Sequence, residues 1–141
     1  MRKIAARQAL ILCAVTLIPS LVVAFLHPKR PAWDANALKE GEVLFATVAA
    51  WQQPVLWVDA RSRKHYEQRH VPDGLLLNED EWDTLLPALL DAWTPGVQTV
   101  VYCDDRQCQA SHHVAKRLRE AGIDPVYVLK GGWQTWLMAK K

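Results

Sequence analysis

Three short apolar runs constrain the fold of this chain more than any other feature of its sequence. They read VLWVDA at 55–60, VQTVVYC at 97–103 and VYVL at 126–129. Each is a short apolar run, and such a run predicts a buried strand. Strands that are apolar along most of their length are typical of parallel sheets, because helices cover both faces of such sheets.

Segments with helical periodicity separate these runs. The clearest one spans Trp82 to Trp93, where apolar residues recur at the spacing of an amphipathic helix. The expected helices cover 38–51, 62–69, 79–93 and 109–121, with one more starting near 131, and LLL at 75–77 predicts a further short strand. Strands that alternate with helices predict a single α/β domain with a mostly parallel central sheet flanked by helices.

The first thirty residues have a different character. Residues 9–26 are uncharged and mostly apolar, and as a helix of about 1.5 Å rise per residue they would just cross a hydrocarbon core. We therefore predict one transmembrane helix within an anchor at 1–30, a linker at 31–37 and the domain at 38–141. One alternative is a cleaved signal peptide, because Val22-Val23-Ala24 resembles a cleavage pattern. The other is a buried helix of a soluble protein.

The position of the domain relative to the membrane follows from the charges that flank this run. Arg2, Lys3 and Arg7 precede it, which favours a cytoplasmic N-terminus and an extracytoplasmic domain on a single-pass membrane protein. Cleavage would instead leave a secreted or periplasmic protein. The net charge of +2 over the whole chain does not indicate the strongly basic surface that nucleic-acid binding requires.

The three cysteines are too few for a disulfide scaffold, so they indicate a reactive role rather than a stabilising one. Cys13 lies within the apolar run, where a buried thiol acts as a small apolar group. Cys103 ends a predicted central strand, at the edge where α/β sheets bind ligands. Residues 104–108 would then curl towards the start of a helix, and backbone N–H groups there stabilise an anion such as a thiolate.

Two other interpretations of Cys103 remain open. It fits a structural thiol at a buried strand end, because cysteine is among the most buried residue types. Metal binding by Cys103, Cys108 and His112 has the right ligand types, but their spacing is weak evidence for it. We predict neither a metal nor a cofactor.

Four motifs occur in an order that resembles the rhodanese-like (sulfurtransferase) domain family over about residues 38–138. They are VDAR at 58–61, HYEQRHVPDG at 65–74, VVYC at 100–103 and VYVLKGGWQTW at 126–136. The resemblance implies that Cys103 takes sulfane sulfur from a small donor, holds it as a persulfide and passes it to a thiol acceptor, either a small molecule or a protein. It also implies that Asp59 and Arg61 support the domain structurally.

The predicted active-site loop departs from the family pattern C-x-x-G-x-R-S. It consists of Asp104, Asp105, Arg106, Gln107 and Cys108. Arg106 stands at the glycine position and Cys108 at the arginine position. The two aspartates should repel thiosulfate, which is a dianion, so another persulfide or a thiol is the expected partner.

Cys108 adds an alternative to sulfur transfer. A second thiol at the end of the loop is suited to attack a persulfide or sulfenate on Cys103. This predicts a thiol-disulfide redox protein in which Cys108 is the resolving residue and a reversible Cys103–Cys108 disulfide forms. The remaining alternative is a catalytically silent rhodanese fold that serves as a binding module.

Overall fold

The computed structural model describes residues 7–8, 12–13, 15–19, 37–104 and 109–140. The chain divides after Ala37 into two units, Met1–Ala37 and Leu38–Lys141. The described residues before 37 are helical. No helix among the described residues is long and apolar enough to cross a membrane. Much of the apolar run at 9–26 lies outside these residues, so the anchor stays a prediction.

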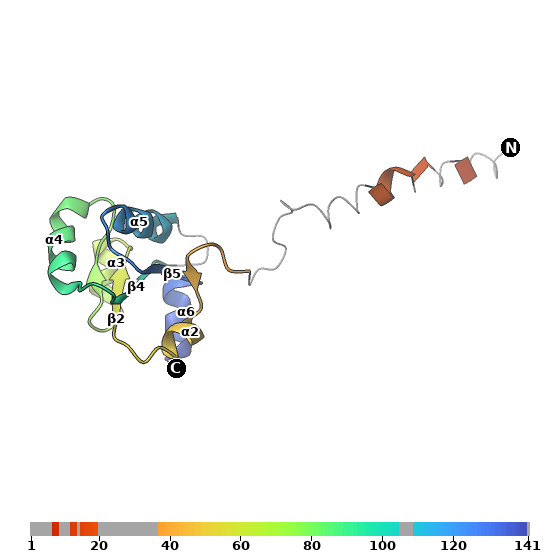
Figure 1. The fold of residues 1–141 in the computed structure, drawn as a ribbon. Coiled ribbons are helices and arrows are strands. Elements are labelled where there is room, and N and C mark those ends of the chain that lie inside the picture. The colour runs from red at the N-terminus through yellow and green to blue at the C-terminus, as the bar shows by residue number, and fades with distance from the viewer. Residues whose placement is uncertain (1–6, 9–11, 14, 20–36, 105–108, 141) are drawn as a thin grey trace. The chain divides into compact units, whose positions relative to one another are not determined.

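A five-stranded parallel sheet forms the centre of the second unit, as Figure 1 shows in part. Its strand order is β1-β5-β4-β2-β3, so β4 lies at the middle of the sheet. The strands are β1 Glu42–Val43, β2 Val55–Asp59, β3 Leu75–Leu76, β4 Gln98–Tyr102 and β5 Val126–Leu129. The predicted α/β architecture with a parallel central sheet is confirmed.

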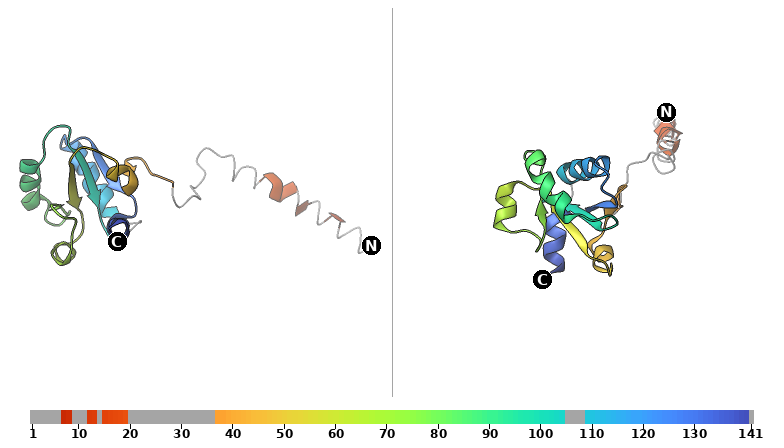
Figure 2. Two further views of the ribbon diagram at one scale, coloured as in Figure 1. Left: turned by 90° about the horizontal axis from the view of Figure 1, so that it is seen from below. Right: turned by 60° about the vertical axis from the view of Figure 1, so that its left-hand side comes forward.

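Helices cover both faces of this sheet, as both views of Figure 2 indicate. They are α2 Phe45–Ala49, α3 Arg63–Gln68, α4 Trp82–Ala92, α5 Gln109–Glu120 and α6 Gly132–Ala139. One core cluster joins residues of α4 and α5 to one sheet face, where Val58, Val101 and Val128 are buried. A second cluster joins α2 and α6 to the other face and is rich in aromatic residues. The alternation along each strand therefore supplies two cores, as a doubly covered sheet requires.

The prediction of one helix over 38–51 is wrong. Residues 42–43 form strand β1, and only Phe45–Ala49 is helical. β1 exists because β5 pairs with it: the N–H of Val128 donates to Gly41 O at 2.8 Å, and the N–H of Lys130 donates to Val43 O at 2.9 Å. A two-residue strand has no periodicity of its own, and its pairing partner lies far along the chain.

Candidate active site

Cys103 directly follows β4 at the carboxyl edge of the sheet. Its side chain belongs to the core cluster on the α4 and α5 side, and only 1% of the residue is exposed. The neighbouring Tyr102 belongs to the opposite cluster, under α6. Successive side chains thus point to opposite faces up to the end of the strand. The cysteine is therefore placed by a rigid central strand.

The backbone of Cys103 is fixed by the start of α6. The N–H of Trp133 donates a hydrogen bond to the carbonyl oxygen of Cys103 at 2.7 Å. Gly132, with φ of +54°, lies so close that a Cβ atom there would overlap this same oxygen. Only glycine both tolerates this φ and leaves room for the carbonyl. The Gly-Gly-Trp sequence at 131–133 thus holds the residue that carries the thiol.

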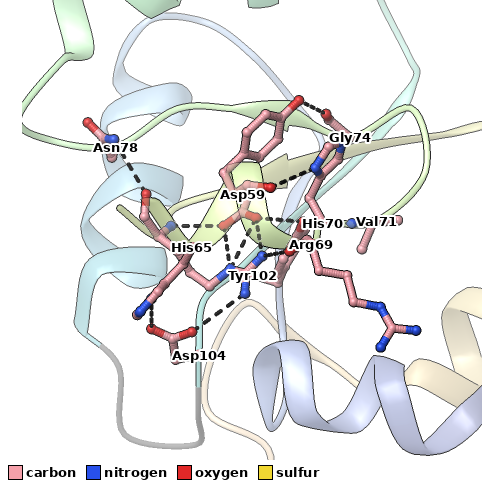
Figure 3. A network of polar contacts seen from close by, with 11 residues as sticks. Asp59, His65, Arg69, His70, Val71, Gly74, Asn78, Tyr102 and Asp104 are labelled. Carbon is pink, nitrogen blue, oxygen red and sulfur yellow. Dashed lines mark hydrogen bonds and ion pairs between the residues drawn. The ribbon is translucent and has the colours of Figure 1, made fainter. Parts of the chain in front are cut away.

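A buried ion pair lies at the end of the neighbouring strand β2 (Figure 3). Asp59 is fully buried and accepts hydrogen bonds from Arg61 Nε at 2.9 Å and Nη2 at 2.7 Å, and from the Arg61 backbone N–H at 2.9 Å. Burial alone would lower the pKa of Arg61, but the hydrogen bonds and charge of Asp59 outweigh it and raise that pKa. The guanidinium therefore stays charged, which a buried pair requires.

Tyr102 completes this network from β4. The parallel register places Tyr102 beside Asp59, and its hydroxyl donates to Asp59 Oδ2 at 2.8 Å while accepting the Val71 N–H at 3.1 Å. Burial raises the pKa of Tyr102 well above its ordinary value, so its hydroxyl remains a donor. This buried phenol connects β2, β4 and the segment after α3.

Arg61 also contacts the aromatic side chains and the backbone around it. Its guanidinium carbon lies 4.6 Å from the ring centroid of Trp133 and 5.5 Å from that of Tyr102, as in cation–π contacts. Its Nη2 donates to the carbonyl oxygen of Arg69 at 2.6 Å. Asp59 and Arg61 thus bind the sheet, α6 and the end of α3 to one another.

Of the predicted active-site loop at 104–108, the structure describes Asp104. Its Oδ1 lies 3.6 Å from Arg61 Nη1, and its Oδ2 lies 3.1 Å from Nδ1 of His65 on α3. The side chains of Asp104 and His65 are each 47% exposed. Each oxygen of the Asp104 carboxylate therefore lies near a nitrogen of a basic residue, Oδ1 near Arg61 and Oδ2 near His65.

Comparison with protein families gives one match, the Rhodanese-like domain, over residues 46–139. The chain belongs to the rhodanese-like domain family. No curated protein matches it in sequence.

Solved structures show the same fold. A rhodanese-like domain protein from Staphylococcus aureus is 22% identical, with a TM-score of 0.52 over 67% of this chain and 89% of that one. The BH2092 protein from Bacillus halodurans is 17% identical, with a TM-score of 0.58 over 70% and 72%. Thiosulfate sulfurtransferase from Pseudomonas aeruginosa is 23% identical, with a TM-score of 0.54 over 79% of this chain but 21% of that one.

Part of the predicted site of this rhodanese-like domain lies outside the described residues. Asp105, Arg106, Gln107 and Cys108 are there, so their roles and the predicted Cys103–Cys108 disulfide stay predictions. Cys13 is a free, exposed thiol in the described part of the first unit.

A second group of charges lies at the same edge of the sheet, at β1 and β5. The Glu42 side chain is 3% exposed; Lys130 Nζ lies 3.0 Å from its Oε2 and His112 Nε2 3.4 Å from its Oε1. His112 is therefore partnered here by Glu42. Burial would raise the pKa of Glu42, but the Lys39 backbone N–H, Lys130 and His112 together lower it.

A cleft of about 430 Å³, lined mostly by apolar side chains, lies elsewhere on the domain, between α2, α6 and β2. Its lining includes Phe45, Trp57, Pro72 and Trp136, but neither Cys103 nor Asp104. Cys103 belongs to the other core cluster, so the cleft is separate from the candidate active site.

Sequence reasoning missed three members of the site. It treated Tyr102 as part of an apolar run, Trp133 as part of a family signature and His65 only as part of a motif. A tyrosine in a buried strand requires a hydrogen-bond partner, which was an available signal. No feature of the sequence indicated the contact of His65 with Asp104, because this contact depends on where the chain goes after β4.

Proposed function

We propose that this protein is a sulfurtransferase that carries sulfane sulfur on Cys103. The observation that supports this most is the placement of Cys103 at the carboxyl end of the central strand of a rhodanese-like sheet, with its backbone held by Gly132 and Trp133. A nucleophile needs such fixed positioning. The beginning of α5, six residues further along the chain, adds the positive end of a helix, which favours a thiolate.

The proposed reaction has two steps. The Cys103 thiolate attacks the outer sulfur of a small persulfide donor, the S–S bond of the donor breaks, and the donor's thiolate leaves with the bonding electron pair. The persulfide on Cys103 then meets a thiolate acceptor, which takes the outer sulfur and returns Cys103 as thiolate. No external oxidant or reductant enters either step.

The membrane anchor belongs to this proposal as well. The apolar run at 9–26 with its basic flank supports a single-pass protein whose domain acts outside the cytoplasm. In cells whose outer envelope has been opened, added protease should then degrade the domain. Protection that lasts until the inner membrane is broken would contradict this orientation.

The full-length protein, purified in detergent and reduced, tests the central proposal. Treatment with thiosulfate or with a low-molecular-weight persulfide should add about 32 Da, one sulfur atom, to the intact mass. Cys103→Ser should abolish the gain, and Cys13→Ser, its matched control, should keep it. An undiminished gain in Cys103→Ser would refute the role of this residue.

A binding module is the second candidate, and the burial of Cys103 favours it. A residue that is 1% exposed presents little of its side chain to a donor. The absence of any mass gain in the wild type with several donors would support this candidate over sulfur transfer.

A further inference from the structure

The cleft on the α2 and α6 side of the sheet has the size of a small-molecule site. Its volume is about 430 Å³, near the lower end of the roughly 300–1,000 Å³ that ligand pockets occupy. Its walls come from α2, β2, α6 and the segment after α3. Ligand pockets are lined mainly by apolar and aromatic side chains, with a few polar groups that orient the ligand. The residues of the lining therefore indicate which kind of molecule fits.

Aromatic rings form much of this lining. Phe45 of α2, Trp57 of β2 and Trp136 of α6 all line the cleft. Trp136 is buried, whereas Phe45 and Trp57 are only partly buried, so part of each of these two rings is open to solvent. Aromatic rings pack favourably against other rings, either offset or edge to face. The cleft is thus suited to a ligand with a flat aromatic ring system.

Neighbouring aromatic residues hold two of these rings in place. Trp136 stacks on Trp133, with ring centroids 5.1 Å apart and an angle of 8° between the planes. Trp57 meets Tyr102 edge-on at a centroid distance of 6.2 Å, and the Tyr102 hydroxyl donates to Asp59. Walls that are fixed by such contacts need little rearrangement when a ligand binds.

Lys140 brings a charge to the lining, and it is the one charged residue among the described residues that line the cleft. It directly follows α6 and is exposed. It forms no ion pair with another residue that the structure describes. An ammonium group attracts an anionic group of a ligand and repels a cationic one.

From this lining we infer that the cleft binds a small aromatic carboxylate. The ring system of the ligand would contact Phe45, Trp57 and Trp136, and its carboxylate would pair with the ammonium group of Lys140. The cleft is separate from Cys103, so this binding requires no sulfur transfer. A failure of the proposed function would therefore leave the inference standing, and the reverse also holds.

A photoreactive aromatic acid shows where such a ligand binds. Full-length protein in detergent would be irradiated with benzoylbenzoate, whose excited ketone inserts into nearby C–H bonds, and the labelled peptides would be mapped by mass spectrometry. Labelling should saturate on peptides that carry α2, Trp57 or α6, and unlabelled naphthalene carboxylate should compete with it. One detergent concentration throughout makes the partition of the probe into micelles the same for every variant.

Ala49→Phe and Ala46→Phe are matched variants on α2. Both alanines are exposed, but Ala49 lines the cleft and Ala46 does not. A phenyl ring at position 49 should occupy the cleft and weaken probe binding by about tenfold or more. The same ring at position 46 should change it by less than about twofold. Urea denaturation of both variants would show that they are folded.

The role of Lys140 is tested with three naphthalene probes of similar size, a carboxylate, an amide and a methylammonium. The wild type should bind the carboxylate most tightly and the cation most weakly. Lys140→Glu should weaken carboxylate binding by about twofold to fivefold and abolish this order, and Lys140→Arg should keep it. Because Lys140 is exposed at the end of α6, these variants test the inference even if Ala49→Phe does not fold.

Four results would overturn the inference. The first is labelling that does not saturate in the wild type, and the second is equal probe affinity in folded Ala46→Phe and Ala49→Phe. The third is equal binding of the three naphthalene probes. The fourth is a dimer of the wild type that Ala49→Phe dissociates, because the cleft would then hold a second copy of the chain.

Discussion

Two carboxylates lie near the same arginine, one of them buried and the other half exposed. Asp59, at the end of β2, is fully buried and lies 2.7 Å from Arg61 Nη2. Asp104, just beyond the end of β4, is about half exposed and lies 3.6 Å from Arg61 Nη1. The first accepts hydrogen bonds from Arg61 and from Tyr102 on the neighbouring strand β4, and the second belongs to a loop. One guanidinium can therefore stabilise the fold through a buried carboxylate and also contact the active-site loop through an exposed one.

Removal of each carboxylate in turn should separate these roles most strongly. Asp59→Ala leaves a buried guanidinium and the Tyr102 hydroxyl without their acceptor, and should lower the free energy of unfolding by about 3–5 kcal/mol. Asp104→Ala removes a half-exposed pair and should cost less than about 1 kcal/mol. Urea denaturation followed by tryptophan fluorescence would measure both. Equal losses in the two variants would contradict the division of roles.

A smaller effect is expected where α6 holds the end of β4. Gly132→Ala would place a methyl group on the Cys103 carbonyl oxygen at a φ of +54°, and should destabilise the domain by about 2–4 kcal/mol. Gly96 has a φ of +87°, and a methyl group on its Cα would meet no other atom within 4 Å. Gly96→Ala is therefore the matched control, with a loss of about 1 kcal/mol from backbone strain alone.

If the two glycine variants unfold at the same denaturant concentration, the close approach of α6 to Cys103 contributes nothing measurable. If Gly132→Ala is well folded yet takes up no sulfur, the contact serves the site more than the fold. Either result would sharpen the contrast between the ends of β2 and β4.

The smallest effect concerns Glu42, a third acid at this edge of the sheet. Its pKa is lowered in the folded protein, so its ionised form stabilises the fold above its unfolded pKa. That contribution is lost as the pH falls through the lower, folded value. Glu42→Gln should therefore cost about 1 kcal/mol at pH 7 and nothing in strong acid. Chemical denaturation at pH 7 and in strong acid would test this; a constant difference at both pH values would exclude the linkage.

The parts of the fold that sequence reasoning predicted are those with a local signal. The runs that form β2, β4 and β5 are buried because their own residues are apolar. The short strand β1 and the partnership of Asp59 with Tyr102 depend instead on register between strands. Register arises from the whole sheet, so no window of sequence contains it. The same holds for His65 and Asp104, which are 39 residues apart.

Sheet order also determines when the site can form during protein synthesis. β5 lies between β1 and β4, and α6, which follows β5 in sequence, supplies the Trp133 N–H that holds Cys103. A nascent chain that has only just exposed Cys103 therefore lacks both the neighbouring strand and the helix that fixes its carbonyl. The ribosome must have released the last element of the domain before this cysteine occupies its place. Until then the thiol is an ordinary side chain on an unfinished polypeptide.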